Sequence, residues 1–236
     1  MITSLTNEKI KEVVKLKNVK NRKEKNLFIV EGPHLVEEAK NMNVLVESYT
    51  ICDDLDGILV SKEVMKKICN TDSVCQIIGI CKYNGAKEIT NRVLILDGVR
   101  DPGNMGTLLR SAKSFGFNTI FCSTDCVDFY NDKVIRASQG SIFKLNLITG
   151  DILQFINSLK KTHDIYGTNV KNGVSVSTVT GFDKIAVVLG NEGVGISEEV
   201  NNILPKNIYI PLDNMESLNV SVAGSIIMYE LKKESN

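Results

Sequence analysis

Apolar and polar residues follow two different periods along the chain, and these periods separate short strands from amphipathic helices. Short apolar runs between turn residues indicate buried strands, whereas apolar residues three and four positions apart indicate one face of a helix. Before residue 82 the pattern predicts a helix over 7–17, a basic turn over 18–26 and a second helix that opens at 31–34. The predicted strands are 27–30, 44–51, 57–60 and 74–81. This alternation predicts a small α/β domain.

A polar stretch over 82–91 contains a glycine and lacks apolar periodicity. Such a stretch is typical of a connection between domains. We therefore expect a first domain over 1–83, a linker over 84–91 and a second domain over 92–236.

The second domain repeats an alternation of strand and helix. Its predicted strands are 92–98, 118–123, 164–169, 184–190 and 208–212. The apolar residues that mark its predicted helices are Met105, Leu108, Leu109, Ala112 and Phe115, then Ile152, Phe155, Ile156 and Leu159, and finally Val220, Ala223, Ile227 and Leu231. Further short helices are expected at 131–138 and, with Ser197 as N-cap, at 198–204. The pattern predicts a mostly parallel sheet with helices on both faces, which binds ligands beyond the carboxyl ends of its strands.

Composition excludes several classes of protein. Hydrophobic residues make up 43% of the 236 and charged residues 24%, as in a folded globular protein. No apolar run reaches the roughly 18–20 residues that cross a membrane, and the N-terminus lacks a secretory h-region, so we expect a cytoplasmic protein without membrane contact. The six cysteines form no CxxC pair and the two histidines lie far from any cysteine pair in sequence, which predicts free thiols and no metal site.

Net charge is zero, but the N-terminal segment is basic. Residues 1–25 hold eight lysines and arginines against three acids, an excess of five positive charges. Such a segment can attract a polyanion such as RNA. An ordinary solvated helix face explains the same composition, and charge alone leaves both interpretations open.

Three strand ends run into loops that combine glycine, asparagine and a charged residue, at 97–110, 189–197 and 210–224. Glycine lets backbone amides approach a ligand, and asparagine donates and accepts at once. Taken singly, these features indicate a tight turn, a surface cation at Arg110 and a loop carboxylate at Glu192. Taken together at the ends of one sheet, they favour a shared cleft. They match neither the dinucleotide fingerprint nor the P-loop, which argues against a nucleotide-binding oxidoreductase.

The same loops resemble the three signature motifs of the SpoU (TrmH) family of RNA 2'-O-ribose methyltransferases, in the same order. The matching segments are NMGTLLRSAKSFGF (104–117), VVLGNEGVGIS (187–197) and IPLDNMESLNVSVA (210–223), with KVIRASQGSIFKL (133–145) similar to the segment between the first two motifs. Upstream, residues 21–39 resemble the family's ribosomal-protein-like substrate-binding domain. The chain departs from the family in the third motif, which is one residue shorter between its IP pair and its SLN core.

The resemblance implies a C-terminal domain with a deep trefoil knot, S-adenosylmethionine as cofactor, RNA as substrate and a homodimer whose active site draws on both subunits. The catalytic residues that it implies are Asn104, Arg110, Glu192, Ser217 and Asn219. Those that it implies for cofactor binding are Thr168, Leu189, Gly190, Ile210, Leu212 and Leu218. The residues expected to contact RNA are Lys17, Lys20, Arg22, Lys23 and Arg136.

Two of these roles have a second interpretation. The family account makes Arg110 a base, but a guanidinium stays protonated in proteins, so we expect it to clamp a phosphate or the developing alkoxide. Asn104 would position the substrate or hold Arg110, and Glu192 would orient Arg110 or the loop through charge-assisted hydrogen bonds. Ser217 could be the N-cap of the closing helix, a role that is compatible with one in the cofactor loop.

The added N-terminal domain favours ribosomal RNA as substrate. A tRNA ribose methyltransferase and a non-catalytic RNA-binding dimer on the same fold are the alternatives.

Overall fold

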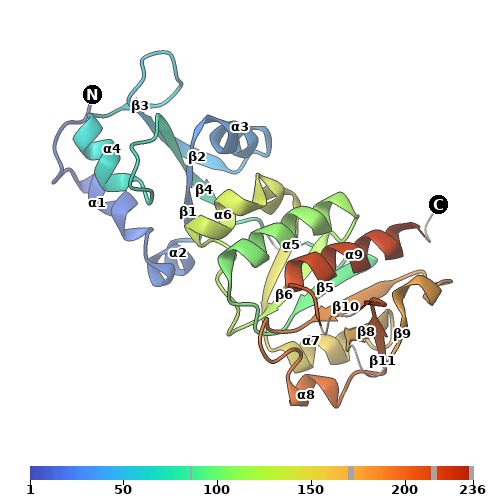
Figure 1. The fold of residues 1–236 in the computed structure, drawn as a ribbon. Helices are drawn as coiled ribbons and strands as arrows, with labels where there is room; N and C mark the ends of the chain where they lie inside the picture. Colours follow the sequence, from blue (N-terminus) through green and yellow to red (C-terminus); the bar gives the residue numbers. More distant parts are fainter. Residues whose placement is uncertain (86, 170–172, 214–216, 234–236) are drawn as a thin grey trace. The chain divides into compact units, whose positions relative to one another are not determined.

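The computed structural model describes residues 1–85, 87–169, 173–213 and 217–233, which form two compact units (Figure 1). The first unit combines Met1–Gly85 with Tyr130–Phe143, and the second takes in the other described residues. The segment 130–143 therefore groups with the first unit, although the sequence pattern assigned it to the second domain. The domain limits 1–83 and 92–236 stay a prediction.

The first unit is a small four-stranded sheet with helices, as the pattern predicted. Its strands are β1 (Leu27–Glu31), β2 (Leu45–Thr50), β3 (Ile58–Leu59) and β4 (Ile77–Lys82), in the order β1-β4-β2-β3. β4 is antiparallel to both β1 and β2, and β3 is parallel to β2. Its helices are α1 (Glu8–Lys15), α2 (Val19–Lys25), α3 (Pro33–Asn41), α4 (Lys62–Ile68) and α6 (Asp132–Ser138). Ile10, Met65 and Ile68 pack against Ile29 and Ile78 of the sheet.

Two helices of this unit escaped the sequence analysis. The predicted basic turn over 18–26 is wrong, because α2 occupies most of it. Asn18 begins the helix by accepting a hydrogen bond from the Lys20 N–H at 2.8 Å, and Asn26 ends it in the left-handed conformation with φ of 53°. α4 begins in the same way, with the Ser61 hydroxyl accepting from the Val64 N–H at 3.3 Å. Caps define both helices, and neither shows an apolar stripe long enough to be read from periodicity.

The second unit contains the mostly parallel sheet that the sequence predicted. Its strands are β5 (Arg92–Leu96), β6 (Thr119–Ser123), β7 (Asn146–Gly150), β8 (Asp164–Thr168), β9 (Val174–Ser175), β10 (Ile185–Leu189) and β11 (Lys206–Tyr209). They lie in the order β7-β6-β5-β10-β8-β11-β9, and each neighbouring pair is parallel. β7 and β9 were not predicted. The short 3-10 helix η2 (Val176–Thr178) also belongs to this unit, whereas η1 (Ser141–Lys144) lies mostly in the first unit.

Helices cover both faces of this sheet (Figure 1). α7 (Ile152–Leu159) and α8 (Glu198–Asn201) pack through Ile156 and Val200 against Ile95 and Val188 of the central strands. Because successive strand residues point to opposite faces, the buried Leu94 and Leu96 face the other layer. That layer contains α5 (Pro102–Ser114) and α9 (Val220–Lys233), which lie side by side (Figure 1).

Gly224 lets α9 approach the sheet. A Cβ atom at this position would lie 2.6 Å from the side chains of both Leu108 and Leu189. Leu108 belongs to α5 and Leu189 ends β10. Because residue 224 has no side chain, α9 can pack closely against both elements. This contact places the start of α9 beside the carboxyl end of β10.

Two expectations about this unit stay predictions. The first is the trefoil knot. The second is the shortened third motif, because its residues 214–216 lie outside the described residues. None of the described helices combines the length and the apolar character that crossing a membrane requires.

Candidate active site

A cavity of about 400 Å³ opens at the carboxyl ends of β8, β10 and β11. Its volume falls within the range of ligand pockets, about 300–1,000 Å³. Strand ends, the loop 190–196 and the first turns of α9 form its walls. The six residues that the sequence analysis assigned to cofactor binding all line it, namely Thr168, Leu189, Gly190, Ile210, Leu212 and Leu218.

The loop after β10 turns back on itself and forms one wall of the cavity. Asn191 and Gly195 exchange two backbone hydrogen bonds, of 2.9 and 3.0 Å. The closure brings the backbone of Gly195 and Ile196 so close to Gly190 that a Cβ atom there would lie 2.1 Å from it. Gly195 itself has φ of 75°, which L side chains rarely adopt. Two glycines are therefore required by the shape of this wall.

Side chains from the three predicted loops meet in one chain of hydrogen bonds. The Asn104 amide, near the start of α5, donates to a Glu192 carboxylate oxygen at 3.1 Å. Its own oxygen accepts from the Asn219 amide at 3.0 Å. Asn104 therefore connects the loop after β10 to the segment that enters α9. The expected set was Arg110, Glu192 and Asn219. Glu192 and Asn219 are connected here through Asn104, and the catalytic role of these residues stays a prediction.

Asn219 also begins the closing helix. Its side-chain oxygen accepts from the N–H groups of Ser221 at 2.9 Å and Val222 at 3.3 Å, which otherwise have no partner within the helix. The alternative role of Ser217 as N-cap is therefore wrong, because Asn219 holds that position. Ser217 is exposed and lines the cavity.

Glu192 is ionised more readily than an ordinary glutamate. Partial burial raises its pKa, but hydrogen bonds from its own N–H, the Asn104 amide and the N–H groups of Asp101 and Arg100 outweigh burial and lower the pKa overall. The last two contacts measure 3.2 Å and 3.5 Å. The carboxylate therefore serves as the shared acceptor for the loop that precedes α5.

Arg110 lies apart from this network. It is exposed on α5, and its guanidinium makes no hydrogen bond or ion pair with any residue that the structure describes. It does not line the cavity. The expected contact with Glu192 or Asn104 is not formed, since Glu192 binds Asn104 and the two backbone N–H groups instead.

The cations expected to contact RNA have different surroundings. Arg22 is buried, and its guanidinium donates to the carbonyl groups of Leu16 at 3.2 Å and Lys17 at 2.9 Å, where α1 ends. Lys17 donates to the Cys69 carbonyl group. Arg136 pairs with Asp132 at 2.9 Å.

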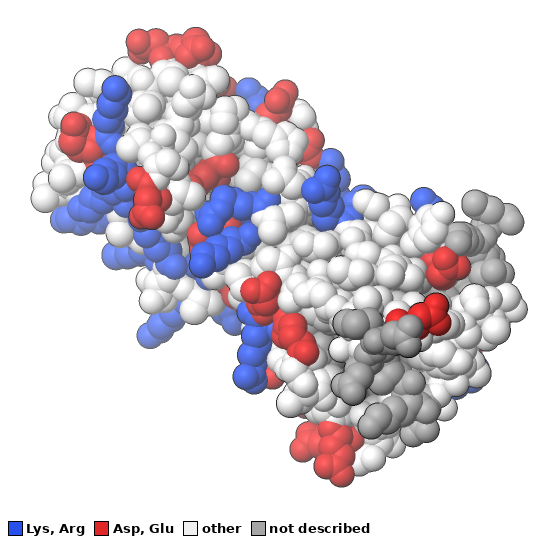
Figure 2. Space-filling model, in the orientation of Figure 1, with Lys and Arg blue, Asp and Glu red and all other residues white. Residues whose placement is uncertain are grey.

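Lys20 and Lys23 are exposed, and their side chains contact no polar partner among the described residues. Lysine and arginine side chains gather around this part of the first unit (Figure 2). These two lysines are therefore the members of the predicted set that remain free to bind a phosphate.

Several cavity residues were missed. Val220, Ala223 and Ile227 were assigned to the buried stripe of the closing helix, yet they line the cavity. Asn169 and Tyr209 line it as well, at the ends of β8 and β11. Their position at carboxyl ends of parallel strands was the available signal, since that edge is where such sheets bind ligands.

Comparisons with known proteins agree with this arrangement. Residues 91–229 match the model of the SpoU rRNA Methylase family, and residues 7–79 match an MRM3-like substrate binding domain. A 23S rRNA (guanosine(2553)-2'-O)-methyltransferase from Bacillus subtilis, RlmP, is 33% identical over 98% of each chain.

Solved structures share the fold over the whole chain. An AdoMet-bound rRNA methyltransferase from Sinorhizobium meliloti matches with a TM-score of 0.86 at 24% identity and covers 100% of this chain and 98% of its own. A putative RNA methyltransferase of the TrmH family from Porphyromonas gingivalis matches with a TM-score of 0.85 at 26% identity, over 98% of this chain and 100% of its own.

Gly190→Ala tests the shape of the cavity wall. The added methyl group would meet the backbone of the loop, so we expect a loss of about 1–3 kcal/mol in the free energy of unfolding. Urea denaturation measures it. Gly193→Ala is the matched control, because a Cβ there has its nearest neighbour at 3.5 Å, and it should change stability by less than about 0.5 kcal/mol. Equal stability of the two variants would show that the loop can move to accept a side chain.

Proposed function

This chain belongs to the SpoU rRNA methylase family, and we propose that it transfers the methyl group of S-adenosylmethionine to a ribose 2'-hydroxyl of ribosomal RNA. One observation carries the proposal. The loops after β10 and β11 and the start of α5 are joined by the Glu192–Asn104–Asn219 hydrogen bonds beside a cavity of about 400 Å³. The six residues that the resemblance assigned to cofactor binding all line that cavity.

The cavity walls suit a cofactor with an apolar ring and polar edges. Leu189, Ile210, Leu212 and Leu218 supply apolar surface, and the bare backbone at Gly190 lets amide and carbonyl groups approach a ligand. S-adenosylmethionine would supply a methyl group on a positively charged sulfur, which is already activated for transfer and needs no metal ion. The S. meliloti structure, of the same fold, is described as AdoMet-bound.

The protein's task is then to place the ribose hydroxyl in line with that methyl group and to assist loss of its proton. Arg110 remains protonated and binds the RNA phosphate or the developing alkoxide, while phosphate or water takes the proton. Asn104, Glu192 and Asn219 act by holding the three loops together. Ser217, at the cavity wall, is positioned to contact the ribose or the cofactor loop.

Ribosomal RNA is the substrate that the comparisons favour. The B. subtilis relative, which acts on 23S rRNA, matches both units of the chain. A structure concerned with methylation of C/U34 on tRNA matches 61% of the chain. Residues 7–79 of the first unit match a substrate binding domain, and Lys20 and Lys23 in it are exposed, which supports an RNA contact outside the methylase domain. An exposed loop or hairpin is the expected target, because the nucleotide must reach the cavity.

A homodimer, the knotted C-terminal domain and a cytoplasmic location complete the proposal. The supporting observation for the dimer is the exposed guanidinium of Arg110, which no described residue of its own chain holds. A second copy could supply the missing contacts, as the family resemblance implies.

The function is tested with labelled S-adenosylmethionine and ribosomal RNA from a strain that lacks this gene. We expect label on one ribose, located by mass spectrometry of nuclease fragments. Calorimetry with S-adenosylmethionine separates the alternatives, because a non-catalytic RNA-binding dimer has no reason to bind the cofactor. Label on tRNA alone would support the tRNA alternative and contradict ours.

Arg110→Ala should lower kcat by about 10²–10³-fold, the usual cost of losing a donor that stabilises transition-state charge. Affinity for S-adenosylmethionine should stay within about twofold, because Arg110 does not line the cavity. Lys161→Ala, which removes another exposed cation of the second unit, is the control and should leave kcat unchanged. Arg110→Lys should show no new titration in its pH–rate profile. A titration near the lysine pKa would show that residue 110 removes the proton itself.

Lys20→Ala and Lys23→Ala should weaken RNA binding, and each should reduce the slope of log K against log salt by about 0.7–0.9. Filter binding over a range of salt concentrations measures both effects. Arg22→Ala should instead lower the free energy of unfolding by about 1–3 kcal/mol, because it removes the buried guanidinium that donates to the Leu16 and Lys17 carbonyl groups. An unchanged salt slope in both lysine variants would place the RNA-binding surface elsewhere.

A further inference from the structure

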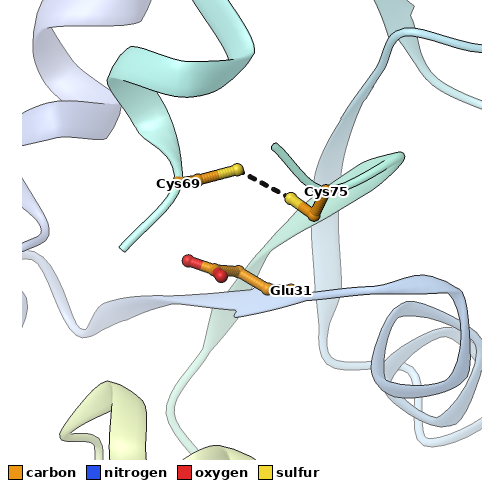
Figure 3. Close-up of side chains that lie close together, drawn as sticks. All are labelled: Glu31, Cys69 and Cys75. Atoms are coloured by element: carbon orange, nitrogen blue, oxygen red, sulfur yellow. Dashed lines mark hydrogen bonds between the residues drawn. The ribbon is translucent and has the colours of Figure 1, made fainter. Parts of the chain in front are cut away.

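Two thiols and a carboxylate meet in the first unit, in a place that methyl transfer does not use (Figure 3). Cys69 directly follows α4, Cys75 lies shortly before β4, and Glu31 ends β1. The two Sγ atoms are 2.7 Å apart, and the ligand atoms of all three residues lie within 4.8 Å of one another.

We propose that Cys69 and Cys75 form a reversible disulfide within the chain, with a hydroperoxide as oxidant. The separation of 2.7 Å approaches the sulfur–sulfur bond length of about 2.05 Å. Two thiolates on one tetrahedral zinc ion, each about 2.3 Å from the metal, would lie about 3.8 Å apart. The geometry is therefore closer to a sulfur–sulfur bond than to a metal site.

Glu31 holds the loop that joins the two cysteines. One carboxylate oxygen accepts from the Asn70 N–H, and the other contacts the Thr71 hydroxyl at 2.9 Å. Both hydrogen bonds fix the residues immediately after Cys69, so the two sulfur atoms are positioned before any reaction occurs. The Glu31 carboxylate therefore anchors this loop.

A small oxidant can reach this loop. Residues 72–74 are exposed and Cys75 is half-buried, whereas Cys69 is 3% exposed. The hydrogen bond from the Cys75 thiol lowers the pKa of Cys69, although burial opposes that shift. The same bond and burial raise the pKa of Cys75. Cys69 is therefore the thiol of the pair that ionises more readily, and it is the nucleophile of the proposed reaction.

The reaction balances with hydrogen peroxide. The Cys69 thiolate attacks one peroxide oxygen, the O–O bond breaks, and hydroxide leaves, which produces a sulfenic acid. The Cys75 sulfur then attacks the Cys69 sulfur, the S–O bond breaks, and water leaves with the Cys75 proton. Two thiols lose two electrons in total, and one peroxide is reduced to two waters.

Three of the other four cysteines provide internal comparisons. Burial raises the pKa of Cys81 to about 12 and that of Cys122 well above its usual value, so both resist ionisation. Cys52 is half-buried, as Cys75 is, and has no neighbouring thiol bonded to it. It is therefore the matched control for an isolated thiol of similar exposure.

The full-length protein, reduced and then treated with hydrogen peroxide, tests the proposal. After alkylation of free thiols, we expect a fraction of the protein in which two cysteines carry no alkyl group. Without alkylation, the mass of that fraction should be about 2 Da below the mass of the reduced chain. Cleavage at Asp72 separates Cys69 from Cys75, so linked peptides on either side of the cut identify the bond. Dithiothreitol should restore both thiols.

Cys75→Ser should abolish the linked peptides and leave Cys69 open to oxidation beyond the sulfenic acid, whereas Cys52→Ser should leave the linked pair unchanged. The wild-type peptide map alone still decides the question if Cys75→Ser fails to fold. Alkylation of Cys69 and Cys75 to the same extent as Cys52 after peroxide would overturn the proposal. If a chelator without a reductant makes the protected cysteines open to alkylation, the proposal would also be overturned, in favour of a metal site.

Discussion

The second unit depends on one side chain that donates and accepts at the same time. The Asn104 amide gives a hydrogen bond to Glu192 and receives one from Asn219. A carboxylate at position 104 would repel Glu192, and an apolar residue would leave two polar partners unpaired beside a cavity. Three segments that are far apart in sequence are thereby held at one edge of the sheet. This contact ties the cavity wall and the segment that enters α9 to the start of α5, and the same Glu192 carboxylate also holds the loop before α5.

The sheet of the second unit was predictable because its central strands are buried on both faces. Residues 93–96 and 185–189 then appear as unbroken apolar runs, which no amphipathic element imitates. β7 and β9 were missed because polar residues and glycine interrupt the first and only two residues form the second. In the first unit, caps determine α2 and α4. A capping residue is harder to recognise in a sequence than a hydrophobic stripe.

The site was predictable only in part, for a related reason. The family resemblance selected the six predicted cofactor-binding residues, and all six line the cavity. Val220, Ala223 and Ile227 could not be separated from core residues, because an apolar stripe faces either a packed neighbour or a cavity with the same periodicity. Counting charges also failed to separate Arg22 from Lys20 and Lys23. Arg22 donates to carbonyl groups at the end of α1, whereas the two lysines have no polar partner among the described residues. Only three-dimensional contacts distinguish a cation that stabilises the fold from one that is free to bind.

The separation between the hydrogen-bonded loops and Arg110 has a consequence for the proposed chemistry. A guanidinium in water stabilises a developing negative charge weakly, because the solvent screens the interaction. The same group becomes effective once water is excluded around it. Arg110 lies exposed in the isolated chain, so its contribution depends on a covering surface that RNA or a second subunit must supply. Glu192, Asn104 and Asn219 need no such cover, since their partners belong to the chain itself. Under the proposed mechanism, the chain holds its cavity ready, and the charge assigned to Arg110 becomes effective only once RNA or a second subunit covers it.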